Sequence, residues 1–433
     1  MISTGYSSHL MQGYKTLQSN LEVIDINNYI RRCFMPSFLG KRLTIGTAAL
    51  AVVGSLFASA VQADEIKVGL LSQYSGTYSW WGQEYDRGVE MFMAETGGKV
   101  GDHTIVIEKR DEGGVNPQRA RQLAQELVIR DKVQYLTGGV FTPTVMGTAD
   151  VVDQTKTPYV FINGATSSIT DKTPYFVRVG YTSWAYCVPL MKWAYEQGAR
   201  EAVSVTADYA PGTDIANAFD TAFTEQGGKI LENIKVPLGT TDFSTYLQRV
   251  ADSGVKHVFM FMPVGPMSAG FIKAFQARGL GDEGITLYAG AETQESDLPA
   301  IGKSAAGIIT ALNYSPYLDT PENKDFVKRY KAQFGPDAIP SLASMGAYDA
   351  MHVIAEMIKA TDGKKDGEAA MAAIKGYSWE SPRGPVSIDP ETREITQNIY
   401  IREVKPVEGG LMGNVPIFTY ENVVEPWHAM QNK

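Results

Sequence analysis

Cysteine and histidine are scarce in this chain of 433 residues, which contains two cysteines and five histidines. Cys33 precedes an apolar segment and Cys187 lies far downstream, so the mature chain offers no pair for an internal disulfide. The histidines are scattered, and none has the spacing of a zinc site. The sequence therefore excludes a disulfide framework, argues against zinc, and predicts that Cys187 is packed inside the protein.

The sequence also lacks the motifs of common catalytic sites. Residues 279–284 read GLGDEG, but they follow an expected helix and precede an expected strand, which is the reverse of a dinucleotide-binding turn. There is no G-x-S-x-G motif, and the GKS at 302–304 lacks the earlier glycine of a phosphate-binding loop. The adjacent acids Asp111 and Glu112 follow a strand, where such pairs are more often solvated than catalytic. We therefore expect neither an enzyme nor a cofactor.

Basic residues are outnumbered, since Lys and Arg total 39, Asp and Glu total 48, and the formal net charge is −9. An acidic chain is a poor partner for nucleic acid or for an anionic membrane surface. We therefore expect no nucleic-acid partner.

The longest apolar run, at 43–57, is shorter than the ~20 residues that a membrane-spanning helix needs. It follows Lys41 and Arg42 and ends in small residues, with Val61 and Ala63 in cleavage-site positions. This pattern predicts a secretory signal peptide at 35–63, cut between Ala63 and Asp64, and a periplasmic mature protein. Residues 1–34 are then an upstream extension, and the sequence leaves open whether translation starts before it or at residue 35.

Beyond residue 64, short β-rich runs alternate with amphipathic stretches, the pattern of parallel sheets built from βαβ units. The pattern occurs twice and predicts two α/β lobes, followed by a helical region and a β-hairpin around a Pro-Glu-Thr turn at 384–404. No linker separates the lobes, so we expect the chain to pass between them more than once. Strands are expected at 66–71, 104–109, 133–138, 158–163, 201–206, 229–236, 256–262, 285–290 and 306–313, and helices at 81–95, 117–131, 212–226, 244–254, 267–279, 321–334 and 341–361.

The mature chain resembles the exported binding proteins of ATP-binding cassette importers, in the class of the branched-chain amino acid (Leu/Ile/Val) receptors. The resemblance spans 64–420 and is carried by DEIKVGLLSQYSG, WGQEYDRGVEMFMAE, RDEGGVNPQRARQLAQELV, NGATSS, DLPAIGKSAAGII, SMGAYDAMHVIAEMI and GPVSID. It implies the type I periplasmic binding protein fold, in which two doubly wound parallel-sheet lobes are joined by three hinge crossings, here near Tyr181, Tyr314 and Gly384. Lobe 1 would comprise 64–183 plus 315–384 and lobe 2 would comprise 184–314 plus 385–433, and hinge closure would trap the ligand between them.

The loop at 73–82, QYSGTYSWWG, carries two tyrosines and two tryptophans, although a connection between a strand and a helix needs no large rings. These rings are either misplaced core or the wall of a binding site. In an open parallel sheet, the loops beyond the carboxyl ends of the strands face one crevice, and this loop is one of them. Trp81 matches the position that contacts the ligand side chain in the resembled receptors.

The resemblance implies further binding residues. Thr142 and Thr166 match the hydroxyl residues that hold the substrate carboxylate. Each is expected to begin a helix, where its hydroxyl and free backbone N–H groups can converge on an anion, although both could instead only cap their helices. Tyr317 matches an aromatic of the family pocket. The other candidates in the facing loops are Tyr74, Phe141, Ala165, Pro211, Gly265 and Glu292.

The second-lobe loops depart from the amino acid receptors. Pro211 and Gly265 stand where those receptors carry tyrosines, and the acid that pairs with the α-ammonium aligns with Ala291 or, after a one-residue shift, with Glu292. If Glu292 reaches the cleft, an amino acid is favoured, because a buried ammonium needs a charged partner. If Glu292 points to solvent, the pocket suits an aromatic or branched carboxylate.

The sequence thus predicts a monomeric receptor that captures a small carboxylate-bearing solute and delivers it to the permease subunits of an ATP-binding cassette importer. A branched-chain amino acid or analogue is the first candidate, and aromatic or other apolar carboxylates and amide or urea-like solutes are the alternatives. Two other classes stay open. A sensor of the same fold would regulate a partner on closing, although the leader argues against it, and a hydrolase using cleft carboxylates would turn over its ligand.

Overall fold

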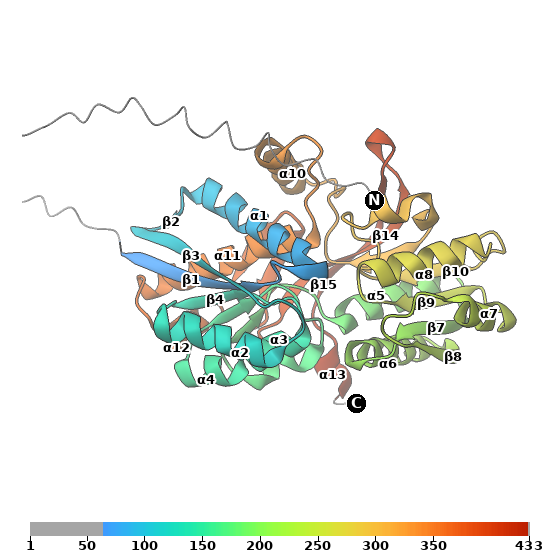
Figure 1. Ribbon diagram of the computed structural model, residues 1–433, viewed down its shortest axis with the longest axis horizontal. Coiled ribbons are helices and arrows are strands. Elements are labelled where there is room, and N and C mark those ends of the chain that lie inside the picture. The colour runs from blue at the N-terminus through green and yellow to red at the C-terminus, as the bar shows by residue number, and fades with distance from the viewer. Residues whose placement is uncertain (1–63, 432–433) are drawn as a thin grey trace, which may run out of the picture. The chain divides into compact units, whose positions relative to one another are not determined.

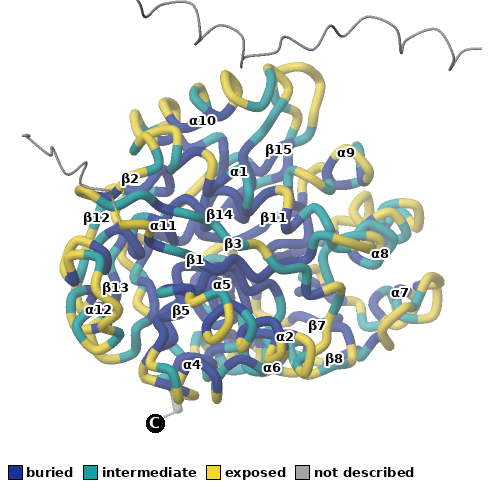
Figure 2. The backbone as a smooth tube through the Cα atoms, turned by 60° about the vertical axis from the view of Figure 1, so that its left-hand side comes forward, coloured by how far each residue is buried: buried dark blue, intermediate teal, exposed yellow. Residues whose placement is uncertain are grey.

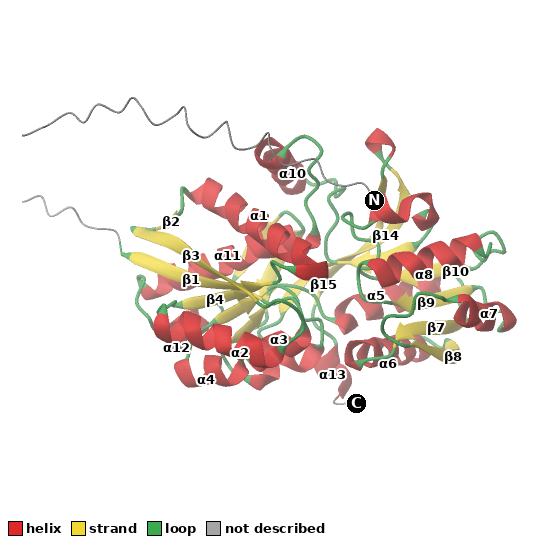
Figure 3. Cartoon of the chain, viewed as in Figure 1, coloured by secondary structure: helices red, strands yellow, loops and turns green. Residues whose placement is uncertain are grey.

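The computed structural model describes residues 64–431, so the predicted upstream extension, signal peptide and cleavage point lie outside the described residues. The described part contains two β-sheets, each covered by helices on both faces (Figures 1 and 3). The central strands are buried and the outer surfaces of helices such as α7 (Ser244–Asp252) and α10 (Pro321–Phe334) are exposed (Figure 2). The predicted α/β class with two lobes is confirmed.

The first sheet is parallel except at one edge, where a short antiparallel strand follows a helix. Its central strand is a nearly continuous apolar run, as expected for a strand that is buried on both faces. In spatial order the strands are β2 (Lys99–Val100), β3 (His103–Asp111), β1 (Glu65–Ser72), β4 (Tyr135–Gly138), β5 (Tyr159–Phe161) and β6 (Phe176–Arg178).

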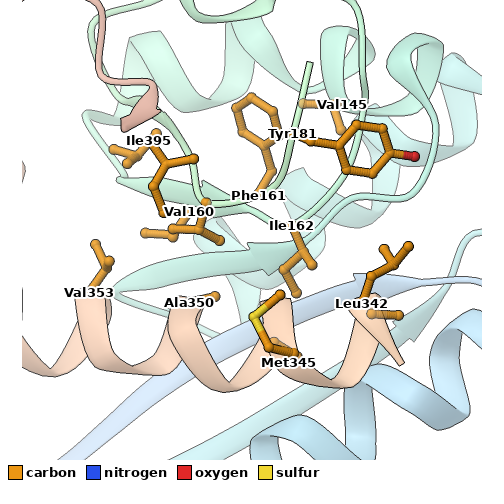
Figure 4. Close-up of a cluster of buried hydrophobic side chains, with 14 of the residues drawn as sticks. Val145, Val160, Phe161, Ile162, Tyr181, Leu342, Met345, Ala350, Val353 and Ile395 are labelled. Carbon is orange, nitrogen blue, oxygen red and sulfur yellow. The ribbon is translucent and has the colours of Figure 1, made fainter. Parts of the chain in front are cut away.

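Two long helices, α1 (Ser79–Thr96) and α11 (Leu342–Thr361), cover one face of this sheet, and α2 (Pro117–Gln125), α3 (Thr142–Gly147) and α4 (Ala149–Thr155) cover the other (Figure 1). A Cβ at Gly88 of α1 would lie 2.0 Å from the carbonyl oxygen of Ser344 in α11, so this close approach requires glycine. Figure 4 shows Ile162, which follows β5, pointing towards Met345 of α11. The helical region late in the sequence therefore completes the first lobe.

The second sheet is mixed, and here the expectation of a parallel sheet is only partly correct. Its five strands from 201 to 312 run parallel, whereas the strands from the C-terminal part add in antiparallel fashion. In spatial order the strands are β12 (Ser378–Ser381), β13 (Gly384–Ile388), β14 (Ile395–Pro406), β11 (Ile309–Leu312), β10 (Thr286–Ala289), β9 (His257–Phe261), β7 (Glu201–Ala207) and β8 (Lys229–Val236), and β15 (Met412–Val423) pairs with the free side of β14.

The helices of the second sheet are also divided between its faces (Figure 3). The pair α5 (Ser183–Glu196) and α6 (Ala210–Glu225) packs on one face, and α8 (Pro266–Ala277) packs with α7 and α9 (Leu298–Ile301) on the other. Cys187 lies in α5 and is fully buried, as predicted. The lobe limits given above remain predictions.

One glutamine joins the three segments that pass between the sheets. Gln397 Nε2 donates to the carbonyl oxygen of Gly180 at 2.8 Å, and its Oε1 accepts from Asn313 Nδ2 at 2.9 Å and from Arg383 Nη1 at 2.6 Å. Arg383 also donates to the carbonyl oxygen of Val179 at 2.7 Å. Each of the predicted crossings therefore contributes at least one group to a single buried hydrogen-bonded cluster.

The last helix, α13 (Trp427–Gln431), returns the C-terminal end of the chain to loops of the first lobe. His428 Nε2 lies 3.1 Å from Asp171 Oδ1, and its Nδ1 lies 3.2 Å from Glu425 Oε2. Glu425 Oε1 in turn accepts a hydrogen bond from Thr182 Oγ1 at 3.0 Å, next to the first crossing. The imidazole therefore lies between two carboxylates from different parts of the chain.

This placement predicts a pH-dependent contribution to stability. Burial lowers the pKa of His428, but the hydrogen bonds and charges of Asp171 and Glu425 outweigh it, so the pKa is raised. A group with a raised pKa in the folded state stabilises fully below its unfolded pKa, and this stabilisation is lost as the pH rises through the folded pKa. We expect His428→Gln to lower the melting temperature by roughly 1–3 °C near pH 5.5 and by less than about 1 °C near pH 8.5. Thermal unfolding followed by circular dichroism measures this, and an equal loss at both pH values would contradict the prediction.

Candidate functional site

The predicted threonine pair comes together at the carboxyl ends of the strands in the first sheet. Thr142 is the first residue of α3, which follows β4, and Thr166 directly precedes the 3-10 helix η4 (Ser167–Lys172), which follows β5. Their hydroxyl oxygens lie 3.1 Å apart, and both side chains are half-buried. The sequence predicted that each begins a helix, and this is correct, although one helix has six residues and the other is a 3-10 helix.

Helix capping does not account for these two hydroxyls. The N-cap residue of α3 is Phe141 and that of η4 is Thr166, and no side-chain hydrogen bond caps either helix. Neither hydroxyl therefore makes a capping hydrogen bond in this structure. Their hydroxyls bond to each other, and each retains donor or acceptor capacity for a further partner.

Buried groups fix the backbone around the threonine pair. Arg178 Nη2 donates to the carbonyl oxygen of Thr166 at 2.7 Å, and Arg178 Nε lies 3.2 Å from Glu394 Oε2, with both side chains almost fully buried. Ser183 N donates to the carbonyl oxygen of Ala165 at 2.9 Å. The pKa of Glu394 is raised to about 7, mainly because the group is buried, and the charge of Arg178 opposes this rise. We take this group as ionised beside the guanidinium, because the separation is that of an ion pair. Hydrogen bonds from Arg178 and Ser183 to its carbonyl oxygens therefore fix the loop at 165–166.

The segment at 73–82, predicted as a loop, ends in the first turn of α1, so Trp80 and Trp81 are helical; its rings are buried or half-buried. Trp81 is 4% exposed and packs edge-on against Tyr85, with ring centroids 5.7 Å apart. Trp80 is half-buried, with its ring 4.5 Å from that of Trp81. Tyr78 is half-buried and meets Phe141 edge-on at 5.0 Å, so the loop after β1 contacts the loop after β4 beside Thr142.

The side chain of Tyr74 points away from the threonine pair, towards α1. Its hydroxyl donates to Asp86 Oδ1 at 2.8 Å, and its ring lies so close to Gly82 that a Cβ there would approach it to 2.7 Å. Burial, followed by the charge of Asp86, raises the pKa of Tyr74. The side chain therefore packs along α1, and no described contact joins it to the threonine pair.

In the second lobe, the two residues that replace tyrosines of the amino acid receptors lie at the starts of helices. Pro211 is the second residue of α6, and Gly265 is the N-cap of α8 with a φ of 115°. A Cβ at Gly265 would meet nothing within 4 Å, so the space beside this position is open. Tyr209, at the N-cap of α6, stacks on Phe261 with ring centroids 6.1 Å apart. Sequence comparison did not single out Tyr209, although it lies in the loop that was expected to face the cleft.

Glu292 does not point to solvent, which excludes one of the two predicted arrangements. Its side chain is 1% exposed, and Oε2 accepts a hydrogen bond from Gly290 N at 2.6 Å. Burial raises the pKa of Glu292 to about 7, opposed by backbone hydrogen bonds and by the charge of Arg402. The charge of Glu292 in turn contributes to the raised pKa values of Tyr181 and Tyr209. The carboxylate therefore lies inside the second lobe within electrostatic range of these phenols.

A buried arginine lies in the same corner of the second lobe. Arg402 donates to the carbonyl oxygens of Tyr314 at 2.7 Å and Gly290 at 3.1 Å, and to Thr310 Oγ1 at 3.0 Å. Burial lowers its pKa to about 10, so it remains a cation at neutral pH. No local sequence signal points to this residue, because it lies in a strand far from the cleft loops.

The two lobes approach each other at aromatic residues. Tyr78 of the first lobe contributes to the raised pKa of Tyr209 of the second lobe, after burial, which places the two phenols near one another. Tyr181, at the first crossing, is 8% exposed, and Figure 4 shows its hydroxyl pointing away from the apolar cluster around Phe161. Tyr78 thus contacts Phe141 next to Thr142 and lies near Tyr209, which is within electrostatic range of Glu292.

Tyr317 lies apart from these residues. Its ring packs against β15, where a Cβ at Gly413 would come within 2.4 Å of it. It lines a groove of about 1060 Å³ together with Glu84 and Arg87 of α1, Glu295, and the β14–β15 turn at 407–411. No described contact joins Tyr317 to the threonine pair.

The expectation that Asp111 and Glu112 are both solvated is wrong for Glu112. Its side chain is 1% exposed and bonds to the two loops that carry the candidate residues of the first lobe. Asp111 is half-buried and binds Ser75 and two backbone amides.

Two further observations concern other classes of site. No helix within residues 64–431 has both the length and the apolar character that would let it cross a membrane. Nor does this part of the chain gather three or more His, Cys, Asp or Glu side chains into a group that could hold a metal ion.

Comparison with known proteins decides the family. The family model described as periplasmic binding protein matches residues 65–410. The chain belongs to the periplasmic binding protein family. A Leu/Ile/Val-binding protein homologue (homolog 6) of Brucella melitensis is 47% identical over 383 residues, which is 88% of this chain and 98% of the relative.

Two similar solved structures carry aromatic acids. A solute-binding protein of an ABC transporter from R. palustris, in complex with 4-hydroxybenzoate, is 42% identical, covers 85% of this chain and 100% of its own, and has a TM-score of 0.80. One from Rhodopseudomonas palustris BisB5, in complex with 3,4-dihydroxybenzoic acid, is 37% identical, covers 84% and 99%, and has a TM-score of 0.79. The predicted family and the type of fold are confirmed, and this receptor type binds solutes.

Proposed function

We propose that this periplasmic binding protein captures an aromatic carboxylate of the hydroxybenzoate kind between its lobes and, as an exported monomer, delivers it to the permease of an ATP-binding cassette importer. The observation that carries the proposal is the pair of hydroxyls on Thr142 and Thr166, 3.1 Å apart and not used as helix caps. When their mutual hydrogen bond breaks, each of these hydroxyls can donate its single proton to the same carboxylate. The rings of Tyr78 and Phe141 lie beside them and offer apolar surface for an aromatic ring.

The second lobe favours a ligand without an ammonium group. Glu292 is bonded by its own backbone and lies within the field of Arg402, so this corner already holds a buried cation. An α-ammonium would bring a second positive charge into the same low-dielectric region. Pro211 and Gly265 leave more room than the tyrosines of the amino acid receptors. The two similar structures with bound benzoates agree with this choice.

A branched-chain amino acid is the second candidate, and a specific observation favours it. The Glu292 carboxylate is buried near Tyr181 and Tyr209, so a neighbouring ammonium would stabilise its charged form. The similar Brucella protein is named as a Leu/Ile/Val-binding homologue. The two candidates share the carboxylate at the threonine pair and differ in whether Glu292 must pair with a cation.

Titration calorimetry on the chain beginning at Asp64 separates these candidates. We expect 4-hydroxybenzoate and 3,4-dihydroxybenzoate to bind with stoichiometry near one, and leucine and valine to bind at least about 100-fold more weakly or not at all. Glu292→Gln should reduce hydroxybenzoate binding by less than about tenfold, whereas it should nearly abolish the binding of an amino acid, because a buried ammonium would lose its counter-charge. Tight leucine binding that disappears in Glu292→Gln would establish the second candidate instead. Recovery of the bound solute unchanged distinguishes a receptor from a hydrolase.

A further inference from the structure

Glu112 ties together the two loops that carry the candidate residues of the first lobe. Its Oε2 accepts a hydrogen bond from Gln73 Nε2 at 2.8 Å and lies 3.3 Å from Thr144 Oγ1, whose proton is shared with the carbonyl oxygen of Phe141 at 3.1 Å. Gln73 begins the aromatic-rich loop, and Thr144 lies two residues beyond Thr142 in α3. The backbone N of Glu112 also donates to the carbonyl oxygen of Ser72, at the end of β1, at 2.8 Å. A movement of this carboxylate would therefore disturb both the aromatic wall and the threonine pair.

The second oxygen of this carboxylate has no donor. Within residues 64–431, no protein group donates to Glu112 Oε1, and no Lys, Arg or His forms an ion pair with Glu112. A carboxylate that is 1% exposed and lacks a cation is costly to keep ionised. Geometry alone therefore indicates that a proton on Oε1 is a low-energy state of this side chain.

The groups facing Glu112 are neutral or acidic. The phenols of Tyr85 in α1 and Tyr159 in β5 lie close enough for its charge to raise their pKa values, after burial. Asp111 precedes it and adds a negative charge, and Arg119 of α2 is used in two hydrogen bonds to the carbonyl oxygen of Asp111, at 2.8 and 3.1 Å. Burial raises the pKa of Glu112 to about 7, with the charge of Asp111 adding to it and the bonds from Thr144 and Gln73 opposing it.

We propose that Glu112 is a positioning residue that takes up one proton when an anionic solute binds at Thr142 and Thr166, so that capture of the solute is coupled to protonation. In the step, a proton from solvent adds to Oε1 and converts the carboxylate into a neutral acid. Oε2 remains an acceptor for Gln73 and Thr144, so both loops keep their positions. The inference rests on the proposed function in one respect, because the solute must bring a carboxylate to the threonine pair.

The physical reason is repulsion between two carboxylates that both contact the short helix α3, the solute at Thr142 and Glu112 at Thr144. A bound anion at Thr142 disfavours a second negative charge near Thr144, so it raises the proton affinity of Glu112. By thermodynamic reciprocity, protonation of Glu112 raises the affinity for the anion by the same factor. Affinity is then highest when the free receptor is already protonated at Glu112, and it falls as the pH rises towards the higher pKa of the bound state. We expect binding of 4-hydroxybenzoate to be about 3- to 10-fold weaker at pH 8.5 than at pH 6.

Glu112→Gln isolates this effect, because glutamine copies the size and the neutral state of the protonated side chain. The variant should bind at pH 8.5 with nearly the affinity that the natural protein has at pH 6. Glu84→Gln is the matched control. Glu84 is also a buried glutamate of the first lobe that accepts from hydroxyls, namely Ser341 Oγ at 2.7 Å and Tyr330 Oη at 3.1 Å, but it has a cation, Arg87, at 2.8 Å.

The test is proton uptake, measured by titration calorimetry with 4-hydroxybenzoate at pH 7.5 in phosphate, HEPES and Tris buffers. The dependence of the observed enthalpy on the ionisation enthalpy of the buffer gives the number of protons bound. We expect about 0.2–0.5 proton for the natural protein and for Glu84→Gln, as a 3- to 10-fold coupling allows, and about zero for Glu112→Gln. A purely structural role for Glu112 would lower affinity without changing this number.

Three outcomes distinguish the possibilities. Uptake that disappears only in Glu112→Gln supports the proposal, and uptake that persists in this variant overturns it. If Glu112→Gln does not fold, the natural protein alone still tests the coupling, since binding without proton uptake and without a change in affinity between pH 6 and 8.5 overturns it. That result leaves the proposed function intact. If neither 4-hydroxybenzoate nor leucine binds, the proposed function and this inference both fail.

Discussion

Thr142→Val and Thr166→Val are each expected to weaken the binding of a carboxylate solute by about 10- to 100-fold. A hydrogen bond to a charged group contributes about 1.5–3 kcal/mol, and each 1.4 kcal/mol corresponds to a factor of ten. Valine keeps the branched shape of threonine, so the hydroxyl is the group that is lost. Neither hydroxyl caps a helix, and we therefore expect little change in folding stability. Titration calorimetry with 4-hydroxybenzoate measures the affinities.

The chain offers a close control for these two variants. Thr155 is also half-buried in the first lobe, and its hydroxyl oxygen lies 3.0 Å from that of Thr157, so it forms a hydroxyl pair like the one at the site. Thr155→Val should leave the affinity unchanged. Because the hydroxyls of Thr142 and Thr166 share a hydrogen bond, the double variant should lose less than the sum of the two single losses. Natural affinity in both single variants would remove the pair from the binding site.

Trp81 is a less direct probe of the same site. Trp81 matches the position that contacts the ligand in the resembled receptors, but it is 4% exposed and packs against Tyr85 inside the first lobe. Its truncation would remove core contacts together with any ligand contact. The threonines separate binding from stability, whereas the tryptophan combines them.

Local pattern predicted most of the regular structure. The helix at 321–334 was placed at its observed bounds, because the sequence around it carries both end signals. Thr320 caps the helix by accepting from Asn323 N, Pro321 occupies its first turn, and Gly335 ends it. The apolar run of β1 and the alternation of β13 and β14 are equally local signals. Signals of this kind depend on residues a few positions apart.

What the sequence did not predict depends on contacts between distant residues. Strand β15 follows a turn and has Pro416 within it, so its pairing with β14 is decided by the partner strand and not by its own pattern. Glu112 illustrates the same point at the site. Its neighbours in the sequence indicate a polar loop, but Gln73 and Thr144, 39 and 32 residues away, enclose it. Arg402 likewise becomes part of the second-lobe corner only through the fold.

Asp349→Asn is expected to lower the free energy of unfolding by about 3–5 kcal/mol, the largest effect on stability that we predict. Asp349 Oδ2 lies 2.8 Å from Arg383 Nη2, and neither side chain is exposed. Asparagine can still accept from Trp379 Nε1 with its single side-chain oxygen, but its NH2 group replaces the Oδ2 that accepts from Ser381, and the negative charge is lost. A buried guanidinium is then left without its counter-charge. Urea-induced unfolding followed by circular dichroism measures the change.

The effect should extend to the hinge, because the same guanidinium bonds to Gln397 and to the carbonyl oxygen of Val179 at the crossings. If Arg383 moves to bind another acceptor, its hydrogen bonds to Gln397 and Val179 are lost. The three crossings are then less well fixed, and we expect ligand affinity to fall along with stability. Asp319→Asn is the matched control, since Asp319 pairs with Lys324 at the surface with side chains that are 88% and 67% exposed, and solvent screens such a pair. We expect no measurable loss from this control. A loss in Asp349→Asn no larger than in the control would mean that the buried pair does not hold the crossings together.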